Sequence, residues 1–236
     1  MVTHLQRDIA RLERQLLVLA RQVEGAFADA FRALFDGELS LGESVIDGDR
    51  EIDLKEVELE EECLRVLALN QPVAKDLRFV VAVLKITDDL ERIGDLAAKV
   101  AERAVHYRVT GSADIPPVMM QLRESMTWML ANSIASFIDG RSELARRVHA
   151  EDREVNRAHA EVVAQLTRSL ATASGAEASR LLDLLTISQS IERAADHTKN
   201  IVEDVLYMVE GEIVRHGQGT ALSLTDESVP ASRSIA

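Results

Sequence analysis

The hexapeptide LERIGD at residues 90–95 returns 101 residues later as IERAAD at residues 191–196. A second block, DREID at residues 49–53, returns 103 residues later as DREVN at residues 152–156. Chance can supply one such match in a helix-rich chain, but two matches in the same order indicate an internal repeat. The sequence therefore predicts two copies of one structural unit.

The composition of the chain favours helix over strand. Of its 236 residues 47% are hydrophobic, whereas only 3% are aromatic and only 4 are proline. Residues 5–33 carry apolar side chains at alternating spacings of four and three, so they are predicted to form an amphipathic helix that ends at Gly37. Five more helices are predicted at residues 40–70, 72–108, 117–138, 142–170 and 176–215. The expected fold class is all-α, with two tandem, repeat-related three-helix bundles.

One interior stretch has the composition of a linker. Residues 110–117 read TGSADIPP and are rich in glycine, serine and proline. They divide the chain into a first three-helix bundle at residues 1–111 and a second at residues 112–216. Residues 217–236 are small and polar, and we expect them to form a disordered tail.

Charge and cysteine content limit the classes of partner and compartment. The formal net charge of −13 opposes binding to nucleic-acid phosphates, so no nucleic-acid partner is expected. A single cysteine, Cys63, permits no internal disulfide and fits a reducing compartment. The N-terminus lacks the apolar stretch of a signal peptide, and the longest uncharged stretch, residues 125–138, is too short to span a bilayer. We expect a soluble, intracellular protein with no direct membrane insertion.

Acidic side chains interrupt the apolar faces of four predicted helices. One face of the third helix carries, at spacings of four and three, Leu77, Val81, Leu84, Asp88, Glu91 and Asp95. The sixth helix repeats this pattern with Leu182, Leu185, Gln189, Glu192 and Asp196. The second carries Asp49, Asp53, Glu56 and Glu60, and the fifth carries His149, Asp152, Asn156 and His159. The pattern predicts acidic clusters at positions where an apolar core would otherwise continue.

Hairpin geometry predicts that the repeated blocks face each other. In an antiparallel hairpin, residues equidistant from the turn lie side by side. The midpoint of Asp49 and Glu91 is position 70, which lies in the predicted turn, and the same register places Asp53 opposite Asp88. The corresponding midpoint in the second half is position 172, where the paired residues are the amides Asn156 and Gln189.

Such clusters need a counter-ion, because carboxylates four residues apart on a helix repel by about 0.2–0.5 kcal/mol and burial adds to the cost. Arg92 and Arg193 are expected to point away, about 100° around the helix. Oxygen-only ligand sets suit Mg, Ca, Mn or iron. The expected cofactors are divalent or trivalent metal cations, with iron, Mn, Mg and Zn as the candidates. The candidate ligands are Asp49, Asp53, Asp88, Glu91, Asp95, Asp152, Glu192 and Asp196. The second site, with two amides, is expected to bind more weakly.

Enzyme classes fit less well, and we expect no catalytic residue. None of the six histidines follows a glutamate by three residues, as di-metal carboxylate oxidases usually require, and no phosphate-binding loop or nucleophile elbow is present. His149 and His159 are weaker candidates for metal ligands. Two alternatives stay open beside a metal-binding regulator: a metal-free helical scaffold, and a metal-dependent enzyme of phosphate chemistry.

The blocks DREID, LERIGD and IERAAD, together with QPVAKDLR at residues 71–78, resemble the PhoU family of bacterial phosphate-uptake regulators. The resemblance covers about residues 5–216, and Ala195 stands where glycine is common in that family. It implies two tandem three-helix bundles that bind metal clusters through Glu/Asp-x-x-x-Asp motifs. Those motifs map here onto Glu91, Asp95, Glu192 and Asp196, with Asp49 and Asp53 opposite.

The same resemblance implies a role and partners that no residue spacing indicates. Family members act in the cytoplasm, often as homodimers. They are thought to link the ATPase subunit of the Pst phosphate ABC transporter, PstB, to the sensor histidine kinase PhoR. The implied function is negative regulation of phosphate uptake and of the phosphate-starvation (Pho) response when phosphate is plentiful.

Overall fold

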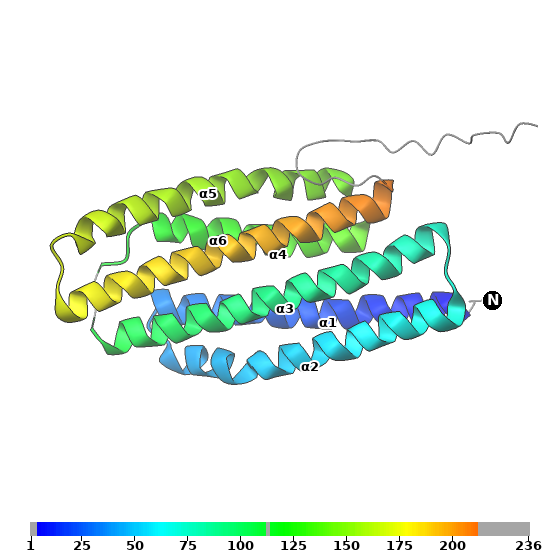
Figure 1. The fold of residues 1–236 in the computed structure, drawn as a ribbon, viewed down its shortest axis with the longest axis horizontal. Helices are drawn as coiled ribbons and strands as arrows, with labels where there is room; N and C mark the ends of the chain where they lie inside the picture. Colours follow the sequence, from blue (N-terminus) through cyan, green and yellow to red (C-terminus); the bar gives the residue numbers. More distant parts are fainter. Residues whose placement is uncertain (1–3, 112–113, 212–236) are drawn as a thin grey trace, which may run out of the picture.

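The computed structural model describes residues 4–111 and 114–211 and confirms the all-α prediction. The helices are α1 (His4–Phe35), α2 (Leu39–Asn70), α3 (Ala74–Val109), α4 (Val118–Asp139), α5 (Ser142–Leu170) and α6 (Gly175–Glu210) (Figure 1). The predicted ranges agree to within two residues except at the end of α6. That helix was predicted to reach Arg215 but ends at Glu210, because Gly211 adopts a left-handed backbone with φ of 77°. Residues 212–215 and the predicted tail lie outside the described residues.

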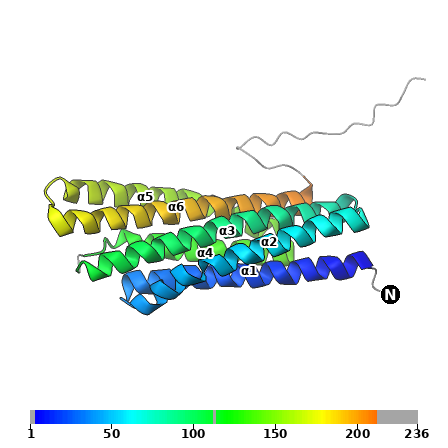
Figure 2. The same cartoon turned by 60° about the horizontal axis from the view of Figure 1, so that its bottom comes forward.

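The six described helices form two three-helix bundles, as predicted from the repeat. Helices α1, α2 and α3 pack together, and so do α4, α5 and α6. The bundles join along α3 and α6, which run antiparallel at the centre of the molecule, and α1 also touches α4. All helices follow the long axis in both views (Figures 1 and 2). The predicted boundary at residues 111 and 112 stays a prediction, since residues 112–113 are not described.

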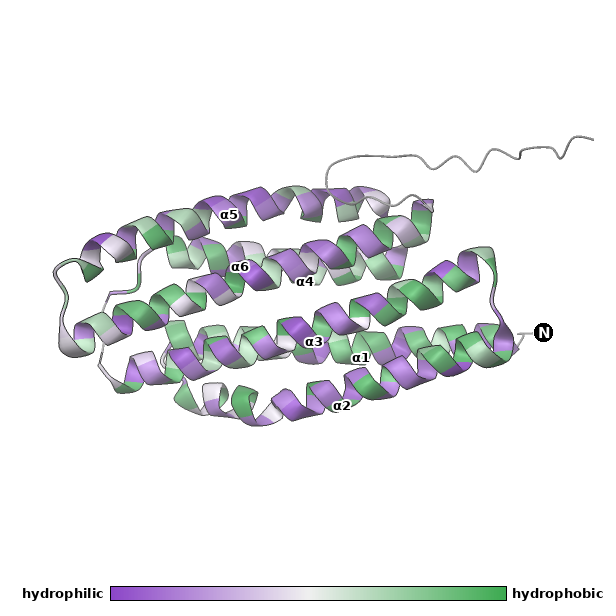
Figure 3. Ribbon diagram, viewed as in Figure 1, coloured by the Kyte–Doolittle hydropathy of each residue, from purple (hydrophilic) through white to green (hydrophobic). Residues whose placement is uncertain are grey.

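Hydrophobic and hydrophilic residues are interspersed along every described helix (Figure 3). On α1 the predicted stripe is confirmed, since Leu12, Leu16 and Leu19 are buried. Over residues 4–111 and 114–211, no helix combines the length and the apolar character needed to cross a membrane.

The core face of α3 differs from the predicted one. Ile86, Leu90 and Ile93 are fully buried, whereas Leu77, which begins the predicted stripe, is exposed. The difference arises because α3 packs against α1 and α2 on one side and against α6 on the other. These neighbours bury most of the helix circumference, and the acidic stripe occupies the part that is left open.

Polar side chains join the two bundles where α3 meets α6, a contact we call the inter-bundle seam. Lys85 on α3 pairs with Asp204 on α6. Asp89, which is buried, accepts hydrogen bonds from His197 Nδ1 at 2.8 Å and from Asn200 Nδ2 at 3.2 Å. Buried carboxylates therefore take part in the docking of the bundles, and each needs a partner from the other helix.

Candidate metal centre

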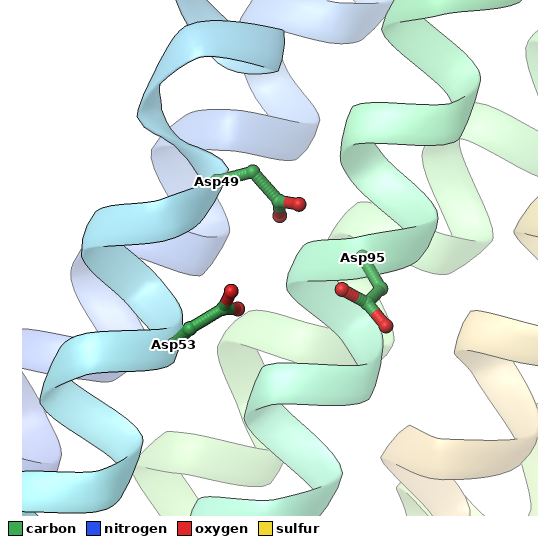
Figure 4. A group of neighbouring side chains, drawn as sticks. All are labelled: Asp49, Asp53 and Asp95. Carbon is green, nitrogen blue, oxygen red and sulfur yellow. The ribbon is translucent and has the colours of Figure 1, made fainter.

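Three carboxylates converge where α2 and α3 lie side by side. Asp49 and Asp53 extend from α2 and Asp95 from α3, and one oxygen of each lies within 4.8 Å of the others (Figure 4). Oxygen ligands hold hard cations at about 2.0–2.6 Å, so two ligands of one ion are at most about 5 Å apart. The three oxygens therefore have the spacing of ligands that share one cation.

Further acids surround these three, and we call Asp49, Asp53, Glu56, Asp88, Glu91 and Asp95 together the first cluster. Burial and the charge of Asp95 raise the pKa of Glu91 to about 6, although Arg92 partly offsets the shift. The pKa of Asp49 is raised by burial and then by Asp95 and Asp53. The pKa of Glu56 is raised by burial and then by Glu60 and Asp88. The ionised forms of these groups are therefore destabilised by burial first and by one another second.

The first cluster contains polar atoms that lack partners. Asp49 Oδ1 and Glu91 Oε2 are buried and accept no hydrogen bond from the described residues. The guanidinium of Arg92 lies 3.4 Å from Glu91 Oε2, outside hydrogen-bonding geometry. Buried oxygens without a hydrogen-bond partner are uncommon in folded proteins, and a bound ion is one way in which such oxygens are satisfied. All-oxygen donors of this kind fit a hard cation such as Mg²⁺, Mn²⁺ or iron.

The hairpin register differs from the predicted one by two positions. Asp49 approaches Asp95, whose common midpoint is position 72, and Glu56 approaches Asp88 about the same centre. The turn explains this, because α2 ends at Asn70 and α3 starts only at Ala74. Each acid on α2 therefore lies opposite an acid about one helical turn away from the expected one. The same set of acids still comes together.

Glycine permits the close approach of the two helices beside the first cluster. A Cβ atom on Gly94 would lie 3.0 Å from Ile52 Cγ2 on α2, which is tighter than ordinary packing. With no side chain at Gly94, α2 and α3 lie near enough for Asp49 and Asp95 to share a site.

Two predictions about the surroundings of the first cluster are wrong. The cluster lies at the open rim of the hairpin and not in the core, since Asp53, Asp88 and Asp95 are exposed while Glu91 is half-buried. Arg92 does not point away from it, because its long side chain folds back to within 3.9 Å of Asp95 Oδ2. More than half of the Arg92 side chain is exposed, so water screens its charge.

The acids predicted in the second half also come together, and we call Asp152, Glu192 and Asp196 the second cluster. Burial and the charge of Asp152 raise the pKa of Asp196. Burial and the charge of Asp196 raise the pKa of Glu192, while His159 lowers it. His149 lies elsewhere, with Nε2 3.3 Å from Glu203 Oε1.

The two clusters border one open cleft between the bundles, with a volume of about 1180 Å³. Glu56 and Asp88 of the first cluster line it from α2 and α3, and Asp152 and Asp196 of the second line it from α5 and α6. The sequence predicted two separate hairpin sites but not that they share this cleft, because the docking of α3 on α6 leaves no periodic signal.

Sequence reasoning also missed Lys199, which donates a hydrogen bond from Nζ to Asp152 Oδ2 at 2.9 Å. Lys199 lies three residues after Asp196, on the same helix face. The midpoint of Asp152 and Lys199 is 175.5, so the register predicted about position 172 did not bring this lysine to Asp152.

The raised pKa of Glu91 is expected to add to the stability of the metal-free protein at acid pH. The pKa of Glu91 is raised from 4.5 to about 6 in the folded state, so the folded chain binds this proton more tightly than the unfolded chain. The free energy of unfolding in the presence of a chelator should therefore fall as the pH rises from about 4.5 to about 6. Urea denaturation at a series of pH values measures this slope. Glu91→Gln should flatten this slope, whereas Glu43→Gln, at an exposed position of α2, should leave the slope unchanged. An unchanged slope in Glu91→Gln would contradict the raised pKa of Glu91.

The fold and the two clusters define a class of protein: an all-helical tandem repeat in which each hairpin gathers carboxylates at its rim. The family model described as PhoU domain matches residues 16–104 and again residues 120–205. The chain belongs to the PhoU family.

Named relatives and solved structures agree with this assignment. The chain is 33% identical to the phosphate-specific transport system accessory protein PhoU of Serratia marcescens, over 91% of this chain and 88% of that protein. It is 36% identical to the PhoU homolog of Aquifex aeolicus, over 89% of this chain and 95% of that protein. The crystal structure of PhoU from Pseudomonas aeruginosa matches with a TM-score of 0.83 and 32% identity, covering 87% of this chain and 98% of that one.

Proposed function

We propose that this chain is a negative regulator of phosphate uptake and of the phosphate-starvation response, acting as a metal-binding adaptor in the cytoplasm. Its relatives in Serratia marcescens and Escherichia coli are named phosphate-specific transport system accessory proteins. A Streptococcus pneumoniae structure with a TM-score of 0.83 and 25% identity is described as a phosphate transport system regulatory protein. The metal part of the proposal rests on one observation, the convergence of Asp49, Asp53 and Asp95 within 4.8 Å.

In this proposal the chain is not an enzyme but a homodimeric adaptor between the transporter ATPase PstB and the sensor kinase PhoR. The names of its relatives as accessory and regulatory proteins support a role through binding. The two bundles offer long helical faces for such contacts. The net charge of −13 favours basic surfaces on the partners.

The metal has a structural role in this proposal. A bound cation would offset the repulsion within the first cluster. Asp49 and Asp53 would then hold α2 against α3 through Asp95 and Glu91, at the spacing that Gly94 permits. The shape of the face presented to a partner would depend on that spacing. This dependence gives the metal a way to affect signalling without any chemical step.

Glu91→Gln/Asp95→Asn is expected to weaken Mn²⁺ binding at the first cluster at least about tenfold, because it removes charged oxygen donors but keeps their shape. Isothermal titration and elemental analysis of the purified protein measure this change. Glu43→Gln/Asp47→Asn neutralises the same number of charges at exposed positions of α2 and should leave Mn²⁺ binding unchanged.

The same variants test the regulatory part. Pull-downs with PstB and PhoR, and a phosphate-starvation reporter in phosphate-rich medium, should show weakened binding and an active reporter for Glu91→Gln/Asp95→Asn alone. A wild-type protein without bound metal, whose variants bind both partners normally, would favour a metal-free scaffold. Turnover of a phosphorylated substrate by the metal-loaded protein would favour an enzyme.

A further inference from the structure

The second cluster is not a copy of the first. The two repeats differ at four positions in and around the clusters. The first-half residue and its second-half counterpart are Asp53 and Asn156, Glu56 and His159, Asp88 and Gln189, and Ala98 and Lys199. Three acids have been lost and one permanent positive charge has been gained. Within the described residues, the first cluster thus gathers six carboxylates, whereas the second gathers three carboxylates beside a half-buried lysine.

That lysine occupies the position of a counter-ion. Lys199 Nζ donates to Asp152 Oδ2 at 2.9 Å, and Asn156 Nδ2 donates to the same oxygen at 3.3 Å. The Asp152 side chain is only 6% exposed, so its charge is largely removed from water.

Among the described residues, no lysine forms an ion pair with the first cluster as Lys199 does with Asp152. Arg92, which is 53% exposed, lies 3.4 Å from Glu91 and 3.9 Å from Asp95 without an aligned hydrogen bond. Among the described residues, Asp49, Asp53 and Asp95 form the group whose ligand atoms converge within 4.8 Å, and the second cluster does not reach this spacing.

We propose that the Lys199 ammonium is the built-in counter-ion of the second cluster, so that this chain exchanges multivalent cations at the first cluster alone. The second half of this statement rests on the metal binding proposed above. A buried carboxylate that loses its partner is left uncompensated, which is strongly destabilising. With Lys199 in place, a metal ion would have to displace an ammonium that already neutralises Asp152.

Two further donor atoms near the second cluster lack hydrogen-bond partners within the described residues. Asp152 Oδ1 and His159 Nδ1 are both buried and make no hydrogen bond within the described residues. Together with Glu192 and Asp196 they provide mixed oxygen and nitrogen donors, a set that Mn²⁺ and Zn²⁺ accept. Removal of the ammonium group should therefore turn the second cluster into a site that attracts a metal ion.

Equilibrium dialysis of the full-length protein against Mn²⁺ tests the proposal. Glu192→Gln/Asp196→Asn should leave the Mn²⁺ content of the wild type unchanged, and Glu91→Gln/Asp95→Asn should remove it. Lys199→Met should bind additional Mn²⁺, which Glu192→Gln/Asp196→Asn then abolishes. Lys75→Met, at an exposed lysine near the first hairpin turn, removes the same charge and should gain no Mn²⁺.

Thermal unfolding in the presence of a chelator supplies a second readout. Lys199→Met should lower the midpoint, and adding Asp152→Asn should restore most of the loss, because no uncompensated carboxylate then remains. The proposal is overturned if Glu192→Gln/Asp196→Asn removes about half of the Mn²⁺ bound by the wild type, or if Lys199→Met gains none. A wild type that binds no Mn²⁺ while Lys199→Met gains it would contradict metal binding at the first cluster but support the role of Lys199.

Discussion

Replacing Leu90 with alanine is expected to lower the free energy of unfolding by about 2–5 kcal/mol, the usual cost of truncating a buried leucine. Leu90 is fully buried on α3, the helix that packs against α1, α2 and α6 together. Because α3 is packed by three other helices, the structure around a fully buried side chain on it has little freedom to shift and fill the space. The resulting cost should be near the upper part of that range.

Leu77→Ala is the matched control, because it makes the same chemical change on the same helix. Leu77 is 41% exposed, so its truncation should change the free energy of unfolding by less than about 1 kcal/mol. Urea denaturation followed by circular dichroism measures both values. Equal costs for the two variants would contradict a core centred on Leu90 and favour the stripe of residues predicted from the sequence.

These two leucines show what sequence patterning can and cannot provide. The helix ranges were predicted well, because proline, glycine and the apolar period mark where each helix starts and ends. The buried face of α3 was not, because a helix with neighbours on several sides has more than one apolar stripe. Leu77, Val81 and Leu84 form a regular stripe, yet Ile86, Leu90 and Ile93 form the core. Periodicity identifies a stripe but does not say which neighbour covers it.

The candidate site was predictable to a similar degree. The repeat and the hairpin rule brought together acids that the structure also brings together, including Asp49, Asp53 and Asp95. The predicted register was wrong by two positions. It depends on the length of the turn, and α3 starts at Ala74 and not at residue 72 as predicted. Lys199 and the inter-bundle cleft escaped prediction because both depend on contacts between segments far apart in the sequence.

The inter-bundle seam yields the second large effect. Near one end of the seam, Asp183 on α6 accepts a hydrogen bond from His106 Nδ1 on α3 at 2.6 Å, and Arg103 Nη1 lies 3.7 Å from its other oxygen. Only 5% of the Asp183 side chain is exposed, so these two groups supply most of its compensation. His106→Leu/Arg103→Leu should therefore destabilise the protein by about 3–5 kcal/mol, because it leaves a buried charge without a partner.

Adding Asp183→Leu to that double variant is the control, since it removes the stranded carboxylate. Replacing a whole buried ionic group by apolar side chains is often neutral or stabilising, so most of the lost stability should return. If the triple variant is as unstable as the double one, the cost arises from lost packing around His106 and Arg103 and not from the charge of Asp183.

The same experiment shows whether the seam makes the two bundles unfold as one unit. Trp128 is the single tryptophan of the chain and lies on α4, so its fluorescence reports on the second bundle, while circular dichroism reports on all the helices. Coincident transitions are expected for the wild type and for Leu90→Ala, because the packing of α3 on α6 transmits a defect in the first bundle to the second. In His106→Leu/Arg103→Leu the weakened contact should separate the two transitions. If they remain coincident in that variant, the apolar part of the seam alone suffices to couple the bundles, and Asp183 contributes to stability without contributing to cooperativity.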